Sequence, residues 1–290
     1  LEENAIPIRA IAGTSIGSEI GAFVASGMPI NELAAIATSF DWKETLQLFM
    51  SDLPTGGLVS GVNIEDFLES WIGAHRIEDL EMGYVAIATD LETRAQVVLD
   101  SGSLVAAVRA SISVPGLIAP HRYDHRDLID GGVVNPLPFD VARDRFGGPV
   151  VAVAVHASAI PERPAPPRSP QWQVRMRQLL DQPWMERTPA MHAWLDEQLA
   201  NLEDDSKTMP IWTTRRVLDR VMNITEAELV RLRAVIRPPD LMFAPEVADI
   251  GMIEFFSAQD AIAAGRRAAE ANLPALHRLA MAAQPTKVGG

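Results

Sequence analysis

Ser15 has the surroundings of a nucleophilic serine. It is the centre of residues 13–17, Gly-Thr-Ser-Ile-Gly, between an apolar run at residues 8–12 and a helical pattern at residues 16–26. A serine on a tight strand-to-helix turn exposes its hydroxyl, and Gly13 and Gly17 would let the strand and the helix pass closely. The following helix points its N-terminus at the serine, so the Ile16 amide is the expected first donor to an oxyanion. The pattern indicates a nucleophile elbow, although the same pentapeptide also arises by chance in glycine-rich turns.

A serine nucleophile requires a base, and Asp130 is the better candidate. It follows the apolar pair at residues 128–129 and precedes Gly131 and Gly132, so its carboxylate would lie at a strand end on a tight turn. If its strand runs parallel to the one before Ser15, their carboxyl ends share one rim of the sheet. An aspartate before glycine is also common in ordinary turns. The pattern leaves both interpretations open.

Two histidines offer an alternative base. His121 and His125 lie in the polar stretch 120–127, which predicts a solvated hairpin. The usual α/β-hydrolase order also fits poorly, because its elbow follows several strands and this chain has room for one before Ser15. A histidine-assisted serine esterase or peptidase therefore stays as an alternative.

No metal or cofactor is predicted. Asp124 and Asp127 cluster with Asp130, but the first two belong to the predicted hairpin and make a poor calcium site. The elbow turn lacks the G-x-G-x-x-G run that binds dinucleotides.

Composition predicts the scaffold that must position these residues. Hydrophobic residues make up 48% of the 290 residues and aromatic residues only 6%, which favours helices packed on a buried parallel sheet, an α/β fold. Patterning predicts strands at 8–12, 84–89, 95–99, 150–155 and 241–244, and helices at 16–26, 30–40, 103–111, 216–236 and 257–282, with a further helix capped by Asn63.

Charge and residue usage exclude several classes of function. A formal net charge of −13 argues against a nucleic-acid binder, which needs a basic surface. The absence of cysteine excludes disulfides and thiolate metal sites. The sequence contains no run of the roughly 18 apolar residues that a membrane helix needs, so we expect a cytoplasmic or peripheral membrane location.

Composition changes abruptly at residue 160. Residues 161–170 are rich in proline, and four of the six tryptophans follow between residues 172 and 212. A helical cap or lid at about 160–215 is expected, either packed on the core as an ordinary cap or facing lipid, with peripheral membrane contact through 172–212.

Several motifs in register resemble the patatin-like phospholipase family, in its bacterial members. They are the serine elbow, residues 109–116 (Arg-Ala-Ser-Ile-Ser-Val-Pro-Gly), residues 130–138 (Asp-Gly-Gly-Val-Val-Asn-Pro-Leu-Pro), residues 88–93 and the late segments 238–241 and 261–265. The resemblance spans nearly the whole chain outside 160–215. It implies one domain over residues 1–290, a three-layer α/β/α fold with a mostly parallel central sheet.

The resemblance also implies a Ser-Asp dyad that acts without histidine. Ser15 would attack an ester carbonyl, and Asp130 would take the serine proton and return it to the leaving alcohol. Water would then hydrolyse the acyl-serine. The implied substrates are phospholipids, lysophospholipids or simpler acyl esters, and no cofactor is needed.

The start of the chain departs from the family pattern. The family's first strand and its glycine-rich oxyanion loop would stand just before Leu1, and residues 2–7 resemble the end of the helix that follows that loop. We therefore expect a sequence that begins inside the fold. Without those donors, a catalytically impaired lipid-binding or interaction protein is the second alternative.

Overall fold

A computed structural model describes residues 1–39, 59, 61–155, 214–247, 250 and 257–283. The chain divides into two units, Leu1–Ile160 with Met222–Gly290, and Pro161–Val221. The fold described below is that of the first unit. The cap or lid expected at about 160–215, and with it the expected membrane contact, falls almost entirely outside the described residues.

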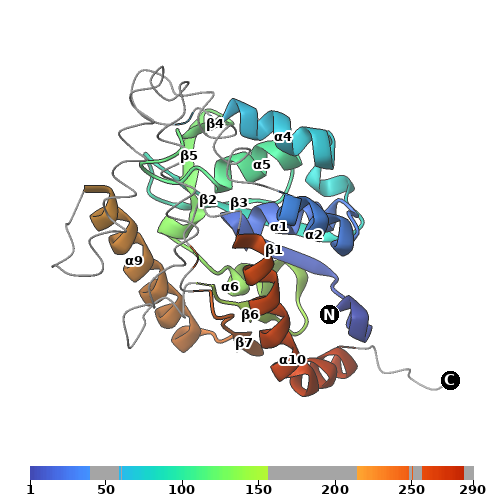
Figure 1. Ribbon diagram of the computed structural model, residues 1–290. Helices are drawn as coiled ribbons and strands as arrows, with labels where there is room; N and C mark the ends of the chain where they lie inside the picture. Colours follow the sequence, from blue (N-terminus) through green and yellow to red (C-terminus); the bar gives the residue numbers. More distant parts are fainter. Residues whose placement is uncertain (40–58, 60, 156–213, 248–249, 251–256, 284–290) are drawn as a thin grey trace, which may run out of the picture. The chain divides into compact units, whose positions relative to one another are not determined.

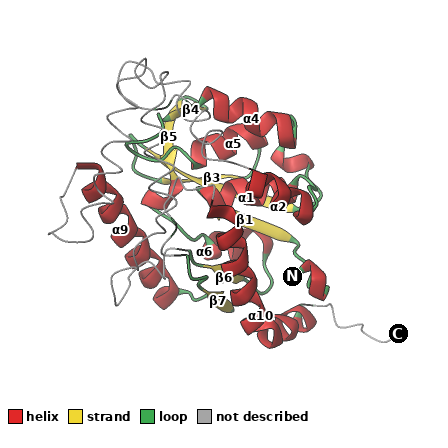
Figure 2. Cartoon of the chain, in the orientation of Figure 1, coloured by secondary structure: helices red, strands yellow, loops and turns green. Residues whose placement is uncertain are grey.

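Helices and strands are interspersed along the described chain (Figures 1 and 2). The order is η1 (Glu2–Asn4), β1 (Ala10–Thr14), α1 (Ile16–Ala25), α2 (Ile30–Ser39), α4 (Val62–Ile72), η2 (Ile77–Asp79), β2 (Gly83–Asp90), β3 (Gln96–Leu99), α5 (Leu104–Ser111), β4 (His121–Tyr123), β5 (Arg126–Asp130), η3 (Gly131–Val133), α6 (Phe139–Phe146), β6 (Val151–Val153), α9 (Thr214–Ile236), β7 (Leu241–Phe243) and α10 (Ala258–Ala282).

The central sheet is mixed, which corrects the expected mostly parallel sheet. β1 pairs with β2 in parallel, whereas β3 and β5 pair with β2 and β4 pairs with β5 in antiparallel fashion. Short turns join β2 to β3 and β4 to β5 and favour an antiparallel arrangement of those two pairs, because a parallel neighbour needs a long crossover. β4 and β5 are joined by Asp124 and His125 alone, both with positive φ, as hairpin turns require. β6 and β7 form a separate parallel pair, so the strand predicted at 150–155 is shorter and lies outside this sheet.

β1 and β5 share one edge of β2. Ile87 of β2 pairs with both β1 and β3, and Ala88 pairs with both β3 and β5. A strand residue has two edges, so β3 holds one edge and β1 and β5 divide the other. β1 is parallel to β2 and β5 is antiparallel to it, so their carboxyl ends run toward each other and meet between Ile87 and Ala88.

Helices cover both faces of β2, which confirms the α/β/α layering. Tyr84, Ala86 and Ala88 belong to a core cluster with residues of α1, α4 and α5. The alternate residues Val85 and Ile87 belong to a second cluster with Val141 of α6. This alternation follows from the two-residue repeat of a strand, and the continuous burial of β2 after its first residue reflects cover on both sides.

The cap of α4 differs from the prediction at Asn63. Gly61 is the N-cap residue, with φ of 85°, and Asn63 lies inside the helix. A Cβ at Gly61 would strike the guanidinium of Arg109, which is 1% exposed. The buried arginine therefore requires glycine at this helix start, and the side chain of Asn63 is not used as a cap.

Candidate active site

Ser15 occupies a strained turn between β1 and α1. Its φ is 54° and its ψ −131°, values that non-glycine residues rarely adopt, and its side chain is partly exposed. A Cβ at Gly13 would strike the backbone of Gly17, whereas a Cβ at Gly17 would meet nothing within 4 Å. Gly13 is thus the glycine that lets the strand and the helix approach. The backbone that Gly13 approaches is that of Gly17.

Neighbouring serines hold the backbone of Ser15. Its N–H donates to Ser111 Oγ at 3.0 Å, and Ser111 Oγ donates to the Ile87 carbonyl at 2.6 Å. Ser18 Oγ donates to the Ser15 carbonyl at 2.7 Å. Ser111 is completely buried in α5. The motif at 109–116 contains Ser111, but sequence reasoning assigned it no role, because its partners lie far away in the sequence.

Ile16 begins α1 directly after Ser15. The first amides of a helix have no partner within the helix and carry its positive end. The Ile16 amide is therefore placed as the sequence predicts for a donor, and its use as one stays a prediction.

Asp130 ends β5 and is 3% exposed. Its Oδ1 accepts from the Gly132 amide at 2.7 Å, and its backbone amide donates to the Ser113 carbonyl at 3.0 Å. A Cβ at Gly131 would strike the Ile87 carbonyl, so the chain can pass this close to β2 only with glycine there. The carboxylate is thus fixed at the point where β5 meets β1.

The strand ends place Ser15 and Asp130 at one junction. Thr14 pairs with Ile87 and Asp130 pairs with the next residue of β2, Ala88. The Thr14 hydroxyl also donates to the Asn135 carbonyl at 2.8 Å, across the two segments that carry the predicted nucleophile and base. The sequence predicts that parallel strands carry these residues to one rim of the sheet. The ends of β1 and β5 meet instead because the two strands run toward each other along β2.

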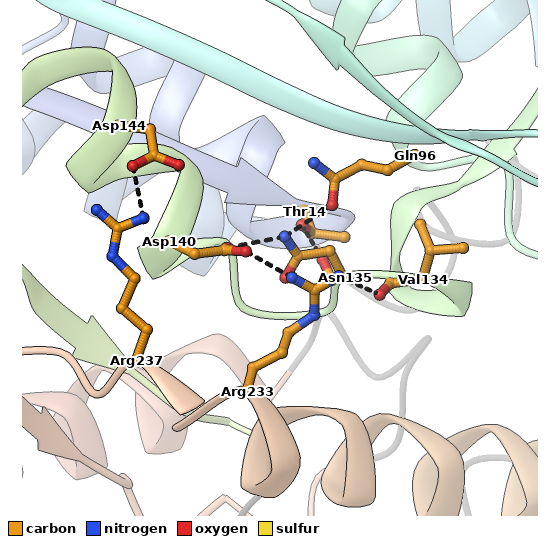
Figure 3. Close-up of polar contacts among 8 residues, drawn as sticks. All are labelled: Thr14, Gln96, Val134, Asn135, Asp140, Asp144, Arg233 and Arg237. Atoms are coloured by element: carbon orange, nitrogen blue, oxygen red, sulfur yellow. Dashed lines mark hydrogen bonds and ion pairs between the residues drawn. The ribbon is translucent and has the colours of Figure 1, made fainter. Parts of the chain in front are cut away.

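A polar network behind this junction connects it to α9 (Figure 3). Asn135 is fully buried, and its Nδ2 donates to Gln96 Oε1 at 2.9 Å and to Asp140 Oδ1 at 3.0 Å. Arg233 of α9 donates to Asp140 Oδ2 at 2.5 Å and to the Val134 carbonyl at 3.0 Å. α9 is thereby bound to the segment that follows Asp130.

The two histidines of the alternative mechanism lie in the β4–β5 hairpin. His121 Nδ1 is 3.3 Å from Glu65 Oε1, and burial together with the charge of Arg109 lowers the pKa of His121 to about 4. His125 is a turn residue with φ of 61°. Among the hydrogen bonds of the described residues, none joins either histidine to Ser15. Asp127 of the same hairpin pairs with Arg122 at 2.9 Å.

Two glutamates, the partly exposed Glu19 and the buried Glu226, have a raised pKa. Burial raises the pKa of Glu19, in the first turn of α1, and of Glu226, in α9, to about 7. Glu226 is 8% exposed, and its Oε1 would lie 2.5 Å from a Cβ at Gly132. Sequence reasoning missed Glu226. The only signal was a glutamate on the same helix face as Val230 and Arg233.

Comparison with known proteins relates this chain to a family and to several proteins. Residues 1–143 match the sequence model of the patatin-like phospholipase family. An uncharacterized NTE family protein of Mycobacterium tuberculosis is 31% identical over 313 residues, which cover 95% of this chain and 86% of that protein. Patatin-like phospholipase domain-containing protein 7 of Mus musculus is 34% identical over 163 residues, 53% of this chain and 12% of that protein.

The chain belongs to the patatin-like phospholipase family. Membership in the patatin-like phospholipase family indicates a hydrolase of lipid metabolism. The family match includes Ser15 and Asp130 but ends before α9, whereas the mycobacterial relative aligns over nearly the whole chain. Within the described residues, none of the helices combines the length and apolarity needed to span a bilayer.

Proposed function

We propose that this protein is a serine lipid acyl hydrolase that uses Ser15 as nucleophile and Asp130 as general base and acid. Its substrates are the carboxylic esters of phospholipids, lysophospholipids or simpler acyl lipids. The observation that carries the proposal is the opposed ends of β1 and β5, which bring the strained Ser15 turn and the buried Asp130 to adjacent positions along β2.

In the first half of the reaction, Ser15 Oγ attacks the ester carbonyl and its proton passes to the Asp130 carboxylate. The Ile16 amide and the positive end of α1 stabilise the oxyanion. When the tetrahedral intermediate collapses, the ester C–O bond breaks and Asp130 gives its proton to the departing alcohol. An acyl-serine remains.

In the second half, water attacks the acyl-serine and loses a proton to Asp130. Collapse of the second intermediate breaks the bond to Ser15 Oγ, which regains the proton. The products are a carboxylic acid and an alcohol. The Gly132 amide, which donates to Oδ1, holds the carboxylate in place through both proton transfers.

Labelling with a fluorophosphonate probe tests the nucleophile. We expect the full-length protein to be labelled at Ser15, and Ser15→Ala to lose labelling because the other hydroxyl of the elbow, on Thr14, is buried and donates to the Asn135 carbonyl. Ser70→Ala is the matched control, since the Ser70 hydroxyl bonds only within its own exposed helix turn. Labelling that persists in Ser15→Ala would overturn the proposal.

Asparagine substitutions test the base. Asp130→Asn should lower the rate of ester hydrolysis by about 100-fold or more, the range for loss of a general base. Asp127→Asn, three residues earlier on β5 and exposed in its pair with Arg122, should leave it unchanged. If Asp130→Asn keeps its activity and His121→Ala loses it, the base is the histidine.

A further inference from the structure

Glu226 is a carboxyl group close to Asp130 that the reaction above does not use. A Cβ built at Gly132 would lie 2.5 Å from Glu226 Oε1 and 3.1 Å from Asp130 Oδ1. Two oxygens that close to one point are less than about 6 Å apart, a range in which like charges perturb each other strongly. Both carboxyl groups are almost completely buried, at 8% and 3% exposed.

One face of α9 fixes the position of Glu226. Glu226, Val230, Arg233 and Arg237 recur at the spacing of a helix face. Val230 is 4% exposed, Arg233 pairs with Asp140, and Arg237 pairs with Asp144 of α6. Glu226 is therefore held beside Gly132 by contacts on both later turns of the helix, and its approach to the site is built into how α9 packs.

A negative charge on Asp130 disfavours ionisation of Glu226. Asp130 faces Glu226 across Gly132. Arg233, two turns along α9, is already engaged by Asp140 on α6. Burial raises the pKa of Glu226 to about 7, in the direction that the geometry requires.

We propose that Glu226 is a positioning residue that tunes the basicity of Asp130, a role that rests on the proposed Ser15–Asp130 reaction. While Glu226 keeps its proton, Asp130 carries the pair's single negative charge. Once Glu226 ionises, repulsion makes Asp130 a stronger base. As Asp130 takes the serine proton it loses the charge that an ionised Glu226 repels, so ionisation of Glu226 speeds the attack by Ser15.

The rate of fluorophosphonate labelling between pH 5.5 and pH 8.5 tests this role without knowledge of the natural substrate. For the unaltered full-length protein, we expect the second-order rate constant of labelling to rise about threefold or more through neutral pH. This rise is additional to the pH dependence that Asp130 itself contributes. Glu226→Gln, which is always neutral, should equal the unaltered protein at pH 5.5 and lack the rise. A rise retained in Glu226→Gln would overturn the role.

A matched control and a second variant separate tuning from damage. Glu228→Gln, two residues along α9 and exposed in its pair with Arg231, should keep the full rise. Gly132→Ala places a Cβ against both Glu226 Oε1 and Asp130 Oδ1, so it should reduce the rise and also slow labelling at every pH. Equal slowing of Glu226→Gln at every pH would indicate a purely structural role and contradict the proposal.

The two proposals fail in different ways. If Ser15→Ala is labelled as well as the unaltered protein, the nucleophile assignment is wrong. If labelling requires Ser15 and the Glu226→Gln profile is unchanged, only the role of Glu226 is wrong.

Discussion

Ser15 can keep its unfavourable φ only if its surroundings hold it there. A sparsely populated backbone conformation of this kind costs a non-glycine residue on the order of 1–3 kcal/mol. Ser111 contributes to that support, because it accepts from the Ser15 amide while donating to the Ile87 carbonyl. One buried hydroxyl thus links the elbow to the central strand.

We predict that Ser111→Ala lowers kcat about tenfold or more with little change in KM, since misplacement of a nucleophile by a fraction of an ångström is costly. It also leaves a buried amide and a buried carbonyl without this partner, which should lower the free energy of unfolding by about 1–3 kcal/mol. Steady-state kinetics with a simple acyl ester and urea unfolding measure the two effects.

Ser103→Ala is the control on the same helix. Ser103 caps α5 by accepting from the Ala106 amide, so its loss should cost about 1 kcal/mol of stability without changing kcat. Equal kcat for the Ser103 and Ser111 variants would refute the support that Ser111 is expected to give.

Sequence patterns reveal Ser15 and Asp130 but not the residues that hold them. Each of the two stands beside glycines that mark a tight turn, which is a local signal. Ser111 contacts an amide 96 positions away, and Glu226 reaches Gly132 from another helix. Such contacts leave no local pattern, so only the fold identifies them.

At the scale of elements, α9 supports the base side of the site. Arg233 binds both Asp140 and the Val134 carbonyl, and Asp140 in turn accepts from Asn135. These contacts clamp the segment that leaves Asp130. The helix is therefore part of the site's scaffold, although the family match ends at residue 143.

We predict that Arg233→Gln lowers the free energy of unfolding by about 1.5–3 kcal/mol, the range for partly buried hydrogen bonds to charged groups. Arg237→Gln, one turn along on the same face, should cost less than about 1 kcal/mol because both members of its pair are largely exposed. Urea unfolding of both variants checks the difference. Equal losses would mean that Arg233 acts only as a surface charge.

Most elements are predictable from the sequence, but the direction of β5 is not. The sequence pattern predicts β2, β3, α1, α5 and α10 to within one residue at each end, whereas β1 begins two residues later than expected. The side of β2 on which β5 lies depends on which edge β3 has already taken. The amino-acid pattern of β5 alone does not show which edge of β2 is already occupied by β3.

At the scale of the whole molecule, two glutamates and one histidine with shifted pKa values change stability in opposite directions as pH rises. The raised pKa of Glu19 and Glu226 means that the folded state holds protons that the unfolded chain releases above about pH 4.5. Their contribution to the free energy of unfolding therefore falls as pH rises from about 4.5 to 7. The lowered pKa of His121 acts in the opposite sense between about 4 and 6.5.

We predict that Glu19→Gln gains stability relative to the unaltered protein as pH rises from 5 to 8, by at most about 3 kcal/mol, given about 1.4 kcal/mol per pKa unit. Burial raises the pKa of the glutamate, and glutamine removes the charge that burial disfavours. Urea unfolding at several pH values measures the gain.

Glu78→Gln provides the contrast. Backbone hydrogen bonds, together with Arg76, lower the pKa of Glu78, so the carboxylate is fully ionised in both folded and unfolded states above pH 5. The difference in free energy of unfolding between Glu78→Gln and the unaltered protein should stay constant across the same pH range. If the difference in free energy of unfolding for Glu19→Gln also stayed constant, the prediction for Glu19 would be refuted.

The meeting of β1 and β5 on one edge of β2 also sets when the enzyme can first act during synthesis. The Thr14–Asn135 hydrogen bond that spans this junction joins residues 121 positions apart, and Glu226 follows later still. The predicted nucleophile therefore leaves the ribosome long before its base and the helix that supports it. A nascent chain would carry the elbow serine without the groups that the proposed reaction assigns to its activation, so we expect hydrolysis to begin only after most of the domain has been translated.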